Sequence, residues 1–195
     1  MKKLPKSKID NLKGYFEEQI QDDGVGTVDE RVAKIIKQTC WLCAVVAVFP
    51  LPVADIYFLS FLQFLMALRI GEIYGKKVDR EEFIHILKSL GLTAVLGYLA
   101  QQTAIGLYRT ILPGLGAVTT IPLVYSLTFA IGKVLHKYFD LESKGESISG
   151  INFKEIWDDL KAEGESIAKK MNKDDLKREA SSIYEAVMGS RKKAG

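Results

Sequence analysis

The chain has 195 residues, of which 48% are hydrophobic and 26% are charged, and its formal net charge is +3. This composition suits a globular protein with one hydrophobic core, and it excludes collagen-like, disulfide-scaffold and wholly disordered chains. So small an excess of positive charge gives no support for nucleic-acid binding.

The N-terminal region is predicted to form an amphipathic helix followed by a break. Residues 7–21 carry apolar side chains at helical spacing, and DDGVG at 22–26 interrupts the pattern. The next four residues, Thr27-Val28-Asp29-Glu30, form a capping box, which predicts that a second helix begins near Val28.

Two proline turns divide the apolar part of the chain into two helical hairpins. The first turn holds Pro50 and Pro52, and a helix is expected after it from residue 53 to about 74. Asp79 and Glu82 mark the start of the second hairpin, whose apolar run extends to residue 112. Its turn contains three further residues that disfavour helix, namely Pro113, Gly114 and Gly116.

The fourth apolar helix is expected over residues 117–139, and the rest of the chain is highly charged. Residues 140–195 contain two amphipathic stripes, and no strand pattern occurs anywhere. We expect the first of these stripes to pack against residues 7–21 or a neighbouring subunit, with binding to a lipid surface as the second alternative. The stripe consists of Phe153, Ile156, Trp157 and Leu160.

The distribution of charge points to a membrane. Residues 38–71 hold two charged side chains, Asp55 and Arg69, and residues 89–132 hold one, Arg109. A helix of about 18–20 residues rises ~27–30 Å and matches the hydrocarbon thickness of a bilayer. Most lysines and arginines near the apolar blocks lie at the open ends of the hairpins, which predicts the inner membrane with both termini in the cytoplasm.

The sequence leaves open whether the hairpins cross the membrane, re-enter it or form a soluble core. The first helix is short before Pro50, so the first hairpin either spans the bilayer or re-enters it. Alternatively the protein is soluble, and both hairpins form its core under cover of residues 7–21 and 150–190.

Three polar residues inside the apolar blocks are the site candidates. Asp55 and Arg109 lie at comparable depth near the hairpin tips, where a structural ion pair or a position on an ion pathway explains them. Gln63 is a third candidate for the pathway or for a hydrogen bond between helices. We favour the structural pair for Asp55 and Arg109.

Signatures of catalysis are absent from the sequence. It has no phosphate-binding P-loop, no nucleophile–His–acid set and no HExxH motif, so we expect a protein that is not an enzyme, with no cofactor, no bound metal and no catalytic residue. Cys40 and Cys43 have CxxC spacing, but no βαβ pattern surrounds them, and we interpret them as buried apolar residues.

Two motifs resemble those of a bacterial family. PLPVAD with the later Gln63 and Tyr74-Gly75, and the LPGLG turn with its Thr-rich helix, resemble the YcjF-like family of membrane-associated domains over roughly residues 30–140. The resemblance implies a helical membrane-associated domain, often joined to an Era-like GTPase domain. Any GTPase would here act in trans.

We therefore expect an all-α fold, an integral membrane helical bundle of two Pro-turn hairpins with amphipathic cytoplasmic helices at both ends. Its parts are an amphipathic helix over 1–26, a membrane-embedded domain over 27–140 and a charged helical region over 141–195. The expected function is a self-associating membrane scaffold or partner-binding module, whose partners are the lipid bilayer, further copies of the chain and a GTPase in trans. The alternative is an oligomeric ion channel or transporter with Asp55, Gln63 and Arg109 near the pathway.

Overall fold

A computed structural model describes residues 6–48, 54–89, 116–147 and 153–188. These residues form seven α-helices and no strand, which confirms the all-α prediction for them. The helices are α1 (Lys6–Gln19), α2 (Val28–Val48), α3 (Ala54–Ile73), α4 (Arg80–Ser89), α6 (Gly116–Ser143), α7 (Phe153–Lys169) and α8 (Lys173–Met188).

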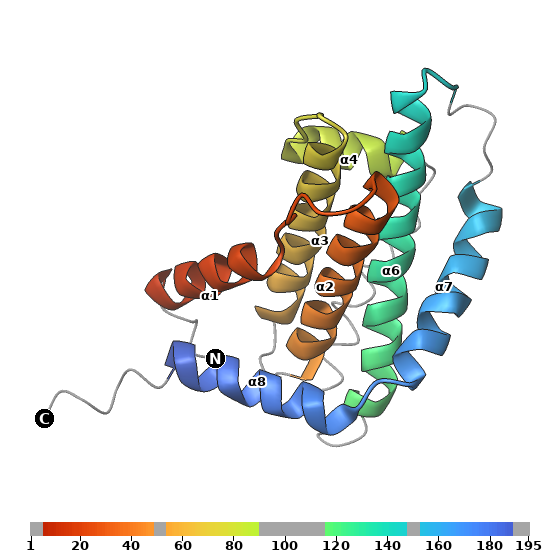
Figure 1. The fold of residues 1–195 in the computed structure, drawn as a ribbon. Helices are drawn as coiled ribbons and strands as arrows, with labels where there is room; N and C mark the ends of the chain where they lie inside the picture. Colours follow the sequence, from red (N-terminus) through yellow and green to blue (C-terminus); the bar gives the residue numbers. More distant parts are fainter. Residues whose placement is uncertain (1–5, 49–53, 90–115, 148–152, 189–195) are drawn as a thin grey trace, which may run out of the picture.

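Helices α2, α3 and α6 lie side by side and form the centre of the bundle (Figure 1). α7 runs along the outer side of α6, while α8 crosses the end of the bundle where α2 finishes and α3 begins. α4 lies at the opposite end, and α1 projects to one side and contacts α8. The two C-terminal helices therefore cover the central helices from one flank and from one end.

Local hydrogen bonds fix the start of α2 as the sequence predicts. The backbone N–H of Thr27 donates to Glu30 Oε2 at 2.8 Å, and the N–H of Glu30 donates to Thr27 Oγ1 at 3.3 Å. These reciprocal bonds are the predicted capping box. In the preceding loop Gly24 has a φ of 70°, a left-handed conformation that glycine adopts without strain.

The predicted start of α4 is also confirmed, because Asp79 Oδ1 accepts the N–H of Glu82 at 2.8 Å. The sequence predicted the end of α6 too early in the chain, at residue 139. That helix continues past Phe139 to Ser143, where Gly145 with a φ of 68° reverses the chain. The N–H of Glu146 then bonds to the carbonyl of Leu141 at 2.9 Å, which closes a Schellman motif.

The second half of α2 is enclosed by protein. From Thr39 to Ala47 almost every side chain is buried, and these residues join one core cluster with Leu62, Met66 and Leu135 from the neighbouring helices. Burial on all sides explains why this stretch of sequence lacks the polar stripe of a surface helix.

The expected packing of the α7 stripe against residues 7–21 is wrong, while packing against a neighbouring subunit stays a prediction. α7 packs along α6, and α8 contacts α1 instead, where Tyr15 Oη donates to Glu179 Oε1 at 3.1 Å. The approach of α7 to α6 is close, because a Cβ on Gly164 would lie 2.7 Å from the Cα of Ser126 and 3.2 Å from the Cβ of Phe129. Glycine at this position lets the two backbones meet.

Among the described helices none is both long enough and apolar enough to cross a bilayer. The transmembrane part of the fold prediction therefore finds no support in these residues. The apolar run expected in the second hairpin lies outside the described residues from residue 90 to its end at residue 112.

Candidate ligand-binding pocket

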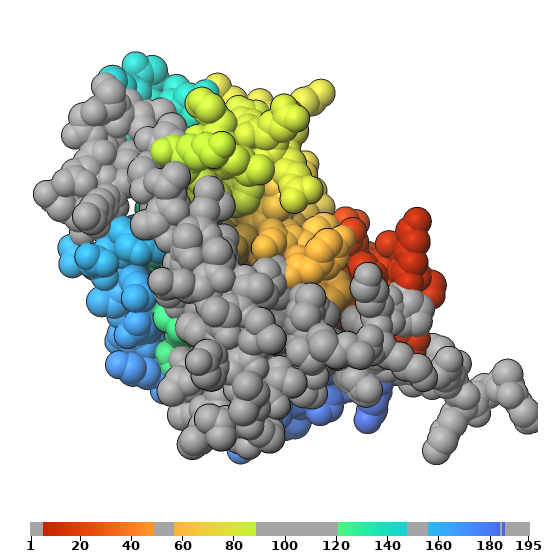
Figure 2. Space-filling view, turned by 180° about the vertical axis from the view of Figure 1, so that it is seen from behind, coloured from red at the N-terminus to blue at the C-terminus, as the bar shows by residue number. Residues whose placement is uncertain are grey.

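A pocket of about 380 Å³ lies between α3 and α4, with Lys13 of α1 at its edge. Figure 2 shows these three helices on one face of the molecule, with α3 between α1 and α4. It is lined by Lys13, Tyr57, Ser60, Phe61, Gln63, Phe64, Arg80, Phe83, Ile84 and Leu87. Its size falls in the range of small-molecule sites, about 300–1,000 Å³.

Helical spacing brings the pocket residues to one face of each helix. α3 supplies Tyr57, Ser60, Phe61 and Phe64, at positions i, i+3, i+4 and i+7. α4 supplies a second set at the same spacing, which consists of Arg80, Phe83, Ile84 and Leu87. The two faces meet at Phe64 and Phe83, whose ring centroids are 5.9 Å apart. The pocket is thus a mainly apolar surface between two helices, and four of its ten lining side chains are aromatic.

Two cations belong to the lining. Lys13 Nζ lies over the rings of Tyr57 and Phe61, at 5.1 and 5.5 Å from their centroids. A hydrogen bond with Tyr57 raises the pKa of the Lys13 ammonium, so this group stays charged at neutral pH. Arg80 is exposed, and no ion pair joins it to another described residue. No described side chain of the lining is acidic.

Gln63 is the one predicted site residue whose side chain can be placed. It is 4% exposed, and its Nε2 donates to Thr128 Oγ1 at 3.3 Å, which joins α3 to α6. This contact is the interhelical hydrogen bond that the sequence offered as one reading of Gln63. The same residue contributes to the wall of the pocket.

The remaining candidates cannot be compared with the prediction. Asp55 belongs to α3, but its side chain is not among those that the structure describes. Gly116 is the first residue of α6. Five other candidates lie wholly outside the described ranges, namely Pro50, Pro52, Arg109, Pro113 and Gly114. The pairing of Asp55 with Arg109 stays a prediction.

Cys40 and Cys43 are both fully buried and are not joined by a disulfide. Burial raises the pKa of both thiols, that of Cys43 to about 12. A neutral, enclosed thiol is a poor nucleophile and a poor metal ligand, so the interpretation of the two residues as core side chains is confirmed. Within the described part of the chain no three His, Cys, Asp or Glu side chains gather as a metal site.

Residues 15–121 match the model of a family described as a domain of unknown function, DUF697. The chain belongs to this family. The match includes α2, α3 and α4, and with them every pocket residue except Lys13. α7 and α8 lie beyond the DUF697 match. Neither a curated protein nor a solved structure matches the chain.

Proposed function

We propose that this DUF697 protein is a non-enzymatic scaffold of the inner membrane, which binds the bilayer through its apolar helices after α7 and α8 have moved off them. It then self-associates and presents its charged helices to a partner on the cytoplasmic side. The family resemblance favours a GTPase in trans as that partner.

The position of α7 along α6 carries this proposal. α6 begins with an apolar stretch, Gly116 to Gly132, that has no charged residue, whereas α7 holds exposed Asp158, Asp159 and Glu163 beside it. A charged side chain at the centre of a bilayer costs about 2.5–3.5 kcal/mol on insertion scales. The apolar part of α6 therefore cannot enter lipid while α7 lies along it, and membrane binding requires the two helices to separate.

The contact at Gly164 provides a way to shift this equilibrium. A side chain at this position meets the backbone of Ser126, which cannot move as a flexible side chain would. The substitution Gly164→Leu should push α7 away from α6 and raise the population of the open state. Gly14→Leu is the matched control, because a Cβ on Gly14 in α1 has no atom within 4 Å.

The experiment is flotation of the purified chain with vesicles of phosphatidylethanolamine and phosphatidylglycerol. We expect Gly164→Leu to increase the bound fraction several-fold, and Gly14→Leu to leave it unchanged. Equal binding by the unsubstituted chain and a folded Gly164→Leu variant would count against the proposal.

A reversible lock tests the same step without relying on the stability of the first variant. The Cβ atoms of the double variant Gly164→Cys, Phe129→Cys would start 3.2 Å apart, close to the 3.5–4.5 Å of disulfides. The oxidised protein should bind vesicles less than the same protein after reduction. If both forms bind alike, separation of α7 from α6 is not part of membrane binding.

A further inference from the structure

The geometry points to a second activity, the binding of a small organic anion with an elongated apolar body in the pocket between α1, α3 and α4. This inference does not depend on the membrane proposal, because it concerns another face of the bundle and uses neither α7 nor α8. It rests on the shape of the pocket, on its aromatic lining and on the charges at its ends.

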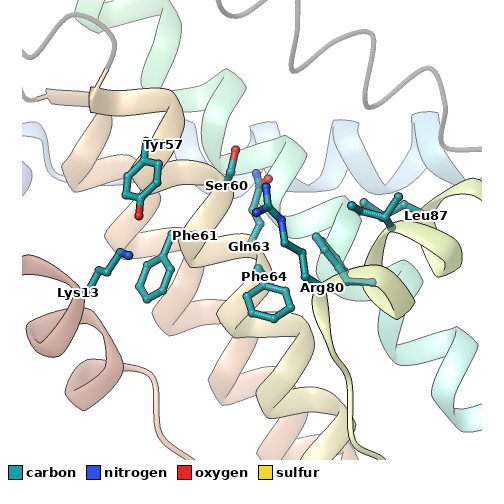
Figure 3. A pocket seen from close by; sticks show the side chains of 10 residues that line it. Lys13, Tyr57, Ser60, Phe61, Gln63, Phe64, Arg80 and Leu87 are labelled. Carbon is teal, nitrogen blue, oxygen red and sulfur yellow. The ribbon is translucent and has the colours of Figure 1, made fainter. Parts of the chain in front are cut away.

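The lining suits an apolar body. Phe61, Phe64 and Phe83 line the same space, and aromatic side chains bury large apolar area at little cost in conformational entropy. Figure 3 shows Phe61 and Phe64 between Lys13 on one side and Arg80 on the other. The two cations thus flank the aromatic surface.

The charged side chains of the lining favour a negatively charged ligand. The described lining holds Lys13 and Arg80 but no carboxylate, and the acidic neighbours of Arg80 along α4, Glu81 and Glu82, do not line the pocket. An arginine without an ion-pair partner offers a planar set of donors that fits a carboxylate. We assign the anionic head of the ligand to Arg80 and its apolar body to the aromatic surface that ends at Lys13 and Tyr57.

Dodecanoate below its critical micelle concentration is the probe, and dodecanol is its uncharged counterpart. Isothermal titration of the full chain should show saturable binding of dodecanoate at least tenfold tighter than that of dodecanol. Arg80→Gln should weaken dodecanoate binding about tenfold, which corresponds to about 1.4 kcal/mol. Lys88→Gln is the matched control, since Lys88 is an exposed cation of α4 outside the pocket lining, and it should leave the affinity unchanged.

A blocking variant separates the pocket from other apolar surfaces. Ser60 is exposed and lines the pocket, so Ser60→Phe should fill the space and abolish dodecanoate binding while the thermal unfolding curve is retained. Three results would each overturn the inference: equal affinity for dodecanoate and dodecanol, an unchanged affinity in Arg80→Gln, or undiminished binding in a folded Ser60→Phe variant. The result of these titrations is independent of the result of the vesicle experiments, because the two tests concern different helices.

Discussion

The hydrogen bond between Gln63 and Thr128 lies within the core, where both residues are at most 4% exposed. Thr128 also interacts with the thiol of Cys43, so its hydroxyl connects α6 to both α3 and α2. A buried polar group that loses its partner costs about 1–3 kcal/mol, more than the net gain from one hydrogen bond. The bond therefore matters chiefly for the buried Gln63 amide, whose described partner is Thr128, whereas the Thr128 hydroxyl also has the Cys43 thiol beside it.

We predict that Gln63→Leu and Thr128→Val each lower the free energy of unfolding by about 1–3 kcal/mol, as measured by urea denaturation. The double variant removes both polar groups, so its loss should be smaller than the sum of the single losses by about 1 kcal/mol. Strict additivity of the two changes would mean that the side chains do not interact.

At the scale of the element, the start of α2 depends on a short motif. Thr27 and Glu30 satisfy backbone donors that the first turn of the helix would otherwise leave unpaired. Thr27→Ala should lower the free energy of unfolding by about 1 kcal/mol, while Thr27→Ser keeps the hydroxyl and should lose much less. Thermal unfolding followed by circular dichroism measures both, and equal losses for alanine and serine would contradict the role of the hydroxyl.

α7 shows what an amphipathic pattern leaves undecided. Its stripe predicts a helix with one buried face, and Trp157 and Leu160 do pack against the core cluster. The pattern does not say which helix receives that face. The close approach of Gly164 to Ser126 decides it, because a residue without a Cβ lets α7 lie directly on α6.

At the scale of the whole molecule, the second half of α2 is enclosed by its neighbours, and its two cysteines report on the opening of the bundle. Cys40 and Cys43 are 0% exposed, and burial raises the pKa of both thiols. We predict that Ellman's reagent modifies them only at the rate of large-scale opening, and that urea within the unfolding transition accelerates the reaction. Rapid modification of the native protein would contradict the enclosed position of α2.

Ser166→Cys supplies the control for this measurement. Ser166 is exposed on α7, so a thiol there should react at once in the native protein. The same assay bears on the CxxC spacing, since a working redox pair would need a thiolate that reagents can reach.

The sequence by itself determined where two of the helices start, α2 and α4. Thr27 with Glu30, and Asp79 with Glu82, predict these starts because a cap is made by residues three apart in the chain and needs no distant partner. The sequence also predicted that Cys40 and Cys43 are buried, since free cysteine in an apolar helix behaves as a small hydrophobic residue and is commonly buried. The end of α6 was missed because the signal, Gly145, follows a charged stretch that the hydrophobic pattern does not reach.

Only the tertiary structure decided which faces meet. The spacing of Tyr57, Phe61 and Phe64 is visible in the sequence, and so is that of Phe83 and Leu87, but neither indicates that the two faces enclose a pocket with Lys13 and Arg80. Gln63 likewise acquires its role only through Thr128, 65 residues away. Contacts of this kind follow from the packing of whole helices, which depends on the sum of many small contact energies. That sum involves residues far apart in the chain, so a local pattern of residues does not predict it.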